Sequence, residues 1–183
     1  MVIIITGASC VGKTHLSQKL LEVIKYPYLS VDHLKMGLIR SKVTNLRPED
    51  DFELTNYLWN IEKEIIMTAI ENKQNLIIEG CYIPFDYRKY FDKEYLKDIL
   101  FIGLSLSKNY INKYYDDIIK YSNIIENRIF DINYSKDEII KDNEYYYNGF
   151  TSYNEKMNVI EDDYSSSIDE IIASVCDYVK RNI

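Results

Sequence analysis

The stretch that decides the fold is Val2-Ile3-Ile4-Ile5-Thr6-Gly7-Ala8-Ser9-Cys10-Val11-Gly12-Lys13-Thr14, near the start of the 183-residue chain. It opens with an apolar β-branched run, which indicates a strand buried on both faces. A loop with two glycines follows. Beyond it Leu16, Leu20 and Ile24 recur at helical spacing, and Pro27 ends that segment. We therefore expect a buried strand, a glycine loop and an amphipathic helix in succession.

The loop between that strand and that helix matches G-x-x-x-x-G-K-[ST], the Walker A pattern. Its glycines let the backbone curl so that successive N–H groups point at a phosphate, and the next helix adds its positive amino end. Lys13 offers a mobile charge to the β- and γ-phosphates of ATP, and the Thr14 hydroxyl is a ligand for Mg²⁺. The predicted nucleotide-binding residues are Gly7, Ala8, Ser9, Cys10, Val11, Gly12, Lys13 and Thr14.

Alternating strand and helix signals continue along the chain. Further strands are expected at 28–31, 76–78, 99–102 and 157–160. Helices are expected from Pro48, with proline in the first turn, through much of the polar stretch 107–148, and after a capping box formed by Ser167 and Glu170. Such alternation predicts a parallel sheet covered by helices on both faces. Ligands then bind at the edge where the strand carboxyl ends lie.

Two carboxylates follow strands at that edge. Asp32 comes after the second strand, where it could orient the proton of an attacking hydroxyl or, alternatively, cap the next helix. Glu79 ends the third strand, where a buried acid needs a partner. That partner is either Mg²⁺, as at a Walker B position, or a structural salt bridge.

The arginines are few enough to weigh one by one. Arg40, Arg47 and Arg88 follow the second and third strands, where an acceptor substrate would lie, and Arg128 falls in the polar helical stretch. Arginine can neutralise the charge on a transferring phosphoryl group. A solvated surface position is the alternative for each.

Composition restricts the partners. The 22 basic and 29 acidic residues give a net charge of -7, which argues against a nucleic-acid partner. The first apolar run is too short for a signal peptide or a membrane span. The three cysteines lack zinc spacing and fit reduced thiols. We expect a cytoplasmic protein with one domain over 1–183, no membrane association, and a monomeric or homodimeric state.

Four segments together resemble the adenylate kinase-like P-loop kinases. They are GASCVGKT, SVDHLKMGL, NLIIEG and the terminal helix after Ser167. The resemblance implies an α/β three-layer sandwich, the P-loop NTPase fold, with a five-stranded parallel sheet of order 2-3-1-4-5. It also implies an acceptor-binding region over about 32–72, a helical lid over about 107–150, and an adenine-lining segment at 162–165.

The same resemblance implies an ATP- and Mg²⁺-dependent phosphotransferase acting on a hydroxyl or phosphate of a small-molecule acceptor. Lys13, Asp32 and Arg128 fall at the positions of catalytic residues, with Arg128 on the lid. After the third strand the chain has Glu79-Gly80-Cys81-Tyr82, whereas adenylate kinases have Asp-Gly-Phe-Pro-Arg, so the acceptor stays open. The alternatives are a polynucleotide 5'-hydroxyl kinase and a non-catalytic ATP-binding sensor module.

Overall fold

The computed structural model describes residues 1–122 and 134–182. Its strands are β1 (Val2–Gly7), β2 (Tyr28–Ser30), β3 (Leu76–Glu79), β4 (Ile99–Leu106) and β5 (Met157–Ile160). Its helices are α1 (Lys13–Ile24), α2 (Val31–Arg40), α3 (Asp51–Glu71), the 3-10 helix η1 (Tyr87–Tyr90), α4 (Lys93–Leu96), α5 (Lys108–Ser122), α6 (Lys136–Ser152) and α7 (Tyr164–Asn182).

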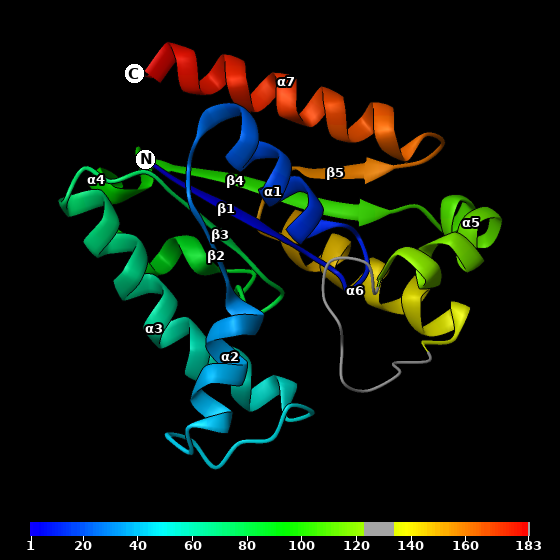
Figure 1. Ribbon diagram of the computed structural model, residues 1–183, viewed down its shortest axis with the longest axis horizontal. Coiled ribbons are helices and arrows are strands. Elements are labelled where there is room, and N and C mark those ends of the chain that lie inside the picture. Colours follow the sequence, from blue (N-terminus) through cyan, green and yellow to red (C-terminus); the bar gives the residue numbers. More distant parts are fainter. Residues whose placement is uncertain (123–133, 183) are drawn as a thin grey trace. The chain divides into compact units, whose positions relative to one another are not determined.

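The five strands form one sheet in the order β2-β3-β1-β4-β5, with parallel pairing (Figure 1). This order confirms the predicted α/β fold class. The register pairs Glu79 with Ser30 and with Ile5, so the third strand ends level with β2 and two residues before the end of β1. The β1 strand is buried along its whole length, as its apolar β-branched sequence predicts.

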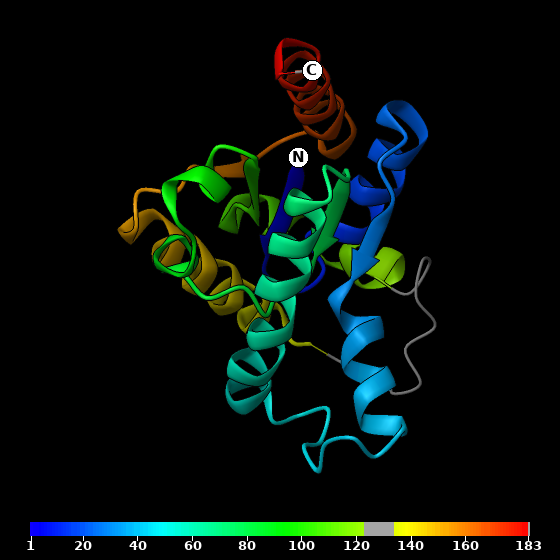
Figure 2. The same ribbon diagram turned by 90° about the vertical axis from the view of Figure 1, so that its left-hand side faces the viewer.

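The chain divides into two compact units. The first comprises residues 1–6 and 26–102. In it α2 lies beside α3 (Figure 2). One face of α3 is buried through Leu54, Leu58, Ile66 and Ala69. Trp59, on the same helix, makes edge contacts with the rings of Tyr87, Tyr90 and Phe91.

The second unit comprises residues 7–25 and 103–183. Here α1 packs against α7, α5 packs against α6, and β5 pairs with the second half of β4. Asn143 of α6 is buried, and its Oδ1 accepts a hydrogen bond from the Leu106 backbone N–H at 2.7 Å. Its Nδ2 donates to the carbonyl oxygen of Ile139 at 2.9 Å. This one amide therefore fixes α6 to the end of β4.

Two predicted helix starts are wrong. The helix expected from Pro48 begins at Asp51, because Arg47 and Asp50 first form a turn in which the Arg47 N–H donates to the Asp50 carboxylate. The last helix begins at Tyr164, so Ser167 lies inside it and the Ser166 N–H donates to Asp163 instead. A capping box does form, but it lies at the start of α6.

Two strands differ in length from their predictions. The fourth extends to Leu106, whereas the second is one residue shorter because α2 begins at Val31. The short elements η1 and α4 were not predicted. Within the described residues no helix combines the length and hydropathy needed to cross a membrane.

Candidate nucleotide and acceptor sites

The phosphate loop requires its first glycine. Gly7 has φ of 143°, and a Cβ added there would lie 2.1 Å from the Leu104 carbonyl oxygen. No side chain fits at that distance, and the contacting atom belongs to the backbone of β4. Gly12 and Cys10 also adopt positive φ, at 91° and 63°. The loop thus curls as the Walker A pattern predicts.

Lys13 is buried and folds back over the loop. Its Nζ donates to the carbonyl oxygens of Ala8 at 2.8 Å and Gly7 at 3.2 Å. The ammonium therefore lies inside the curl of the loop, where a phosphate would meet it. Thr14 follows in the first turn of α1 and is half-buried. The roles of Lys13 at the phosphates and of Thr14 at Mg²⁺ stay predictions.

An acidic side chain from α6 also reaches the loop. The Ser9 backbone N–H donates to the Asp142 carboxylate at 2.8 Å. Asp142 is adjacent to Asn143, the residue that fixes α6 to β4. A negative charge is thus held against one of the amides assigned to phosphate binding. No sequence pattern pointed to Asp142, because the contact joins residues 133 positions apart.

Tyr164 lies against the phosphate loop at Gly12. A Cβ added to Gly12 would lie 1.7 Å from the Tyr164 hydroxyl oxygen, so the phenol lies directly against the loop backbone. Burial raises the pKa of Tyr164 to about 12, with a smaller contribution from Tyr110. Its ring is 6.0 Å from that of His15, measured between centroids. Tyr164 belongs to the segment that the family resemblance places at the adenine.

In the first unit, four side chains after β2 and β3 form a connected cluster, which we call the acceptor cluster: Asp32, Lys35, Asp51 and Tyr82. Lys35 Nζ lies 3.1 Å from Asp32 Oδ1 and donates to the Tyr82 hydroxyl at 2.7 Å. Tyr82 donates in turn to Asp51 Oδ1 at 3.1 Å. Tyr82 is buried, whereas the Asp32 side chain is 28% exposed. Asp32 is therefore accessible to a ligand.

The helix-cap alternative for Asp32 does not match its position. The N-cap position of α2 is Ser30, whose side chain makes no capping hydrogen bond, and Asp32 lies within the first turn. A carboxylate there interacts favourably with the helix dipole. Its side chain is directed into the ion pair with Lys35.

Glu79 is buried at the end of β3, level with Ser30 of β2. The Ser30 hydroxyl is buried and has no hydrogen-bond partner among the described residues. Side chains at paired positions of neighbouring strands point to the same face of a sheet. Oxygen donors of this kind are what Mg²⁺ prefers, usually as one or two carboxylates together with water and substrate phosphates. These residues therefore fit the ion.

Gly80, directly after Glu79, permits a close approach. A Cβ added there would lie 2.7 Å from the Cβ of Val31, the first residue of α2. The segment after β3 therefore touches the start of the helix that carries Asp32. This approach accounts for Tyr82 reaching Lys35.

The predicted arginines that the structure describes lie on separate segments, and their roles at the acceptor stay predictions. Arg47 binds Asp50 and Glu49 and is 70% exposed. Arg88 is exposed on η1, where its guanidinium lies 5.5 Å from the centroid of the Tyr87 ring. Arg40 ends α2, about 12 Å along the helix axis from Asp32 at 1.5 Å per residue. Arg128 lies outside the described residues.

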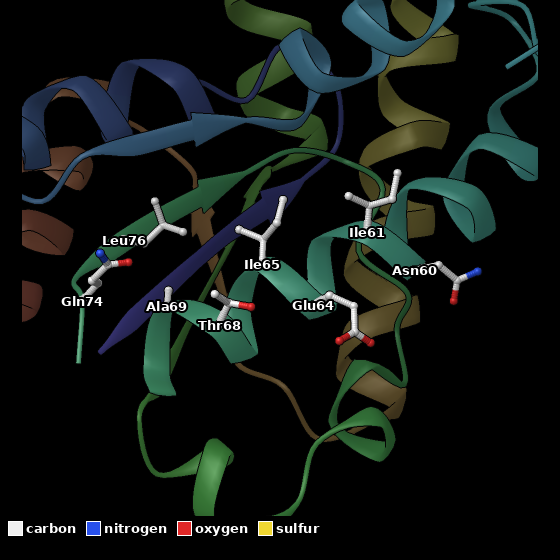
Figure 3. Close-up of a pocket in the computed structure, with 8 residues that line it drawn as sticks. All are labelled: Asn60, Ile61, Glu64, Ile65, Thr68, Ala69, Gln74 and Leu76. Carbon is white, nitrogen blue, oxygen red and sulfur yellow. The ribbon is translucent and has the colours of Figure 1, made fainter. Parts of the chain in front are cut away.

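A shallow groove of about 500 Å³ lies elsewhere in the first unit. It is lined by one face of α3 and the residues around the start of β3 (Figure 3). Gln74 and Leu76 mark its position at the amino end of that strand, whereas the acceptor cluster follows the carboxyl ends. The groove is therefore distinct from the candidate site.

Within the described residues, no group of three or more histidine, cysteine or acidic side chains could hold a metal ion. Sequence patterns assigned no role to Lys35, Asp51, Tyr82 or Asp142, and the family resemblance included Tyr164 only in the segment expected at the adenine. Lys35, Asp51 and Tyr82 meet in the acceptor cluster, and Asp142 and Tyr164 contact the phosphate loop, only once the chain has folded. Tyr82, two residues after Gly80, was the one local signal available.

A Walker A loop joining the first strand and first helix of a β2-β3-β1-β4-β5 sheet defines the adenylate kinase-like P-loop kinase fold. Solved structures agree with this class. A deoxyadenosine kinase from M.mycoides with bound dATP has a TM-score of 0.58 and 16% identity, covering 96% of this chain and 98% of that one. A gluconokinase from Sinorhizobium meliloti 1021 has a TM-score of 0.54 and 11% identity, covering 98% and 94%.

A sugar kinase from Janibacter sp. HTCC2649 has a TM-score of 0.51 and 13% identity, covering 94% of this chain and 92% of that one. No protein-family model and no curated protein sequence matches the chain. At these identities the likeness is one of fold.

Proposed function

We propose that the chain is a kinase that transfers the γ-phosphate of ATP to a hydroxyl of a small-molecule acceptor. The observation that carries the proposal is the position of Lys13, whose Nζ lies inside the curl of a Walker A loop, 2.8 Å from the Ala8 carbonyl oxygen. The fold supports it, because the structural neighbours named above are kinases.

Each residue has a distinct role in this proposal. The loop amides and Lys13 bind the β- and γ-phosphates, and the charge of Lys13 stabilises the transferring group. Asp32 accepts a hydrogen bond from the acceptor hydroxyl and orients it for in-line attack. Arg128, on the segment expected to act as a lid, adds positive charge when the site closes.

Thr14 and Glu79 are the proposed ligands of Mg²⁺, with the Ser30 hydroxyl beside Glu79. The bound ion would neutralise charge on the phosphates. Glu79 is suited to this role, because it offers carboxylate oxygens at the end of β3, the kind of ligand that Mg²⁺ prefers.

The Lys13→Ala variant tests the nucleotide half of the proposal. Removing this charge should lower the phosphoryl-transfer rate by about 10²- to 10³-fold. Lys19→Ala is the matched control, since it removes the same charge from the same helix, six residues further on. Turnover by Lys13→Ala at the rate of the Lys19→Ala control would contradict the proposal.

The Asp32→Asn variant tests the acceptor half. It should abolish acceptor-dependent ADP release while the dissociation constant for ATP stays within about twofold. Tight ATP binding by the unmodified chain, with no acceptor-dependent ADP release from any hydroxyl compound, would indicate the sensor module instead.

A further inference from the structure

We propose that the acceptor cluster selects a neutral molecule with adjacent hydroxyl groups, a sugar, polyol or nucleoside, over an anionic acceptor bearing a carboxylate or phosphate. This inference rests on the proposed function and names the substrate class of that same site. It concerns Tyr82, which contacts both Lys35 and Asp51, and the ion pair that joins Lys35 to Asp32.

The first argument is charge. The cluster contains two carboxylates, one ammonium and one phenol, so its net charge is negative. Lys35 is its only cation, and that ammonium is already engaged by Asp32 at 3.1 Å and by the Tyr82 hydroxyl at 2.7 Å. It also lies 5.0 Å from the centroid of the Tyr82 ring. An anionic acceptor would have to displace these contacts.

The second argument is the state of Tyr82. Burial raises the pKa of its hydroxyl, and the negative charges of Asp51 and Asp32 add to the shift. The phenol therefore keeps its proton and donates it to Asp51 at 3.1 Å. Lys35 donates to the same oxygen, so every contact in the cluster has a fixed donor and a fixed acceptor.

The third argument is what the cluster leaves available. A carboxylate has about four acceptor positions, and the ion pair with Lys35 occupies one side of Asp32. Hydroxyl groups can donate to the remaining positions, whereas the oxygens of an ionised carboxylate cannot. The Asp32 side chain is 28% exposed and that of Lys35 is 14% exposed, so Asp32 presents the more accessible surface.

The fourth argument is the placement of the arginines that follow β2 and β3. Arg47 is held by Asp50 and Glu49, and Arg40 lies at the far end of α2. Arg88 lies on η1 against Tyr87. Of these arginines, Arg47 is thus engaged by its own neighbours and Arg40 begins about two turns of α2 away from Asp32, so neither is arranged around the cluster to bind an anion.

The test uses the full chain with ATP and Mg²⁺, and measures acceptor-dependent ADP release for matched pairs that differ in charge. The pairs are glucose with gluconate, glucose with glucose 6-phosphate, and adenosine with AMP. For at least one pair we expect kcat/KM to be tenfold or more higher for the neutral member. The two glucose pairs test a sugar as the acceptor and the adenosine pair tests a nucleoside, so the assay shows which of these compounds supplies the adjacent hydroxyl groups.

Asp51→Asn is the diagnostic variant. It removes one carboxylate and weakens the contact that holds Tyr82 and Lys35, so the neutral-to-anionic ratio of kcat/KM should fall by about tenfold while KM for ATP is unchanged. Glu53→Gln is the control, because it removes a charge from the same exposed first turn of α3. It should leave the ratio as it is.

Turnover of anionic members alone, or an equal response of both variants, overturns this inference and leaves the kinase proposal intact. Absence of turnover with every compound overturns both. In that case ATP binding by the unmodified chain and by Lys13→Ala still reports whether the loop binds nucleotide.

Discussion

The backbone N–H of Ser9, in the phosphate loop, donates to the carboxylate of Asp142, in α6, at 2.8 Å. Asp142 is adjacent to Asn143, whose amide fixes α6 to the end of β4. This helix, most of which lies within the segment expected to form the lid, is thus joined to the nucleotide loop through the Asp142 carboxylate. A triphosphate entering the loop would meet this negative charge.

Replacing that acid should strengthen nucleotide binding. Asp142→Asn removes a negative charge held against the loop, and the loss of repulsion should lower the dissociation constant for ATP by about three- to tenfold, which is about 1 kcal/mol. Titration calorimetry with ATP and Mg²⁺ measures the effect. Asp137→Asn is the control, since Asp137 is exposed in the first turn of the same helix. Unchanged or weaker binding by Asp142→Asn would show that the carboxylate does not oppose the phosphates.

Two glycines should respond in opposite directions to the same substitution. Gly7→Ala forces a Cβ to within 2.1 Å of a backbone oxygen at positive φ, so we expect a loss of stability of about 2 kcal/mol or more. Gly37, in α2, has open space around its Cα, and Gly37→Ala should stabilise the helix by about 0.5–1 kcal/mol. Urea unfolding measures both. Similar midpoints for the two variants would contradict the close approach at Gly7.

The hydrogen bond between Asn143 and Leu106 predicts how a substitution at Asn143 changes the stability of the protein. Asn143→Leu leaves the buried N–H of Leu106 without its acceptor, which should cost about 1–3 kcal/mol. Asn148→Leu serves as the control, because Asn148 is exposed on the same helix. Thermal unfolding at one pH compares them, and an Asn143→Leu variant as stable as its control would mean that α6 is held by other contacts.

Local patterns predicted the parts of the site that are local in sequence. The Walker A loop is continuous, so its spacing was enough to place Lys13 and Thr14. Asp32 and Glu79 were proposed as site residues because each directly follows an apolar run predicted as a strand, and their roles stay predictions. The acceptor cluster could not be found in this way, since Lys35 and Tyr82 are 47 residues apart and meet only after β2 and β3 pair.

The capping boxes show the same limit. Ser135 and Glu138 have the same Ser-x-x-Glu spacing as Ser167 and Glu170, but only the first pair forms a capping box. At the second pair Asp163 already accepts the Ser166 N–H, so the helix starts earlier. A local motif does not show which of two neighbouring residues begins a helix, because that depends on where the preceding strand ends.

A buried acid in α3 predicts how stability depends on pH. Both carboxyl oxygens of Glu62 are buried and have no hydrogen-bond partner among the described residues. Burial raises the pKa of Glu62 from 4.5 to about 8. The folded state therefore keeps a proton that the unfolded state releases above the lower value. Between these two pKa values this group lowers stability as the pH rises, by up to about 1.4 kcal/mol per pH unit.

The Glu62→Gln variant removes this dependence, because the amide has the same shape and does not ionise. Its stability relative to the unmodified chain should increase steadily between pH 5 and pH 8, as measured by urea unfolding at each pH. Glu64→Gln, an exposed acid on the same helix, should show no such trend. A constant difference for Glu62→Gln across this range would mean that Glu62 is ionised in the folded protein, with its charge balanced inside the first unit.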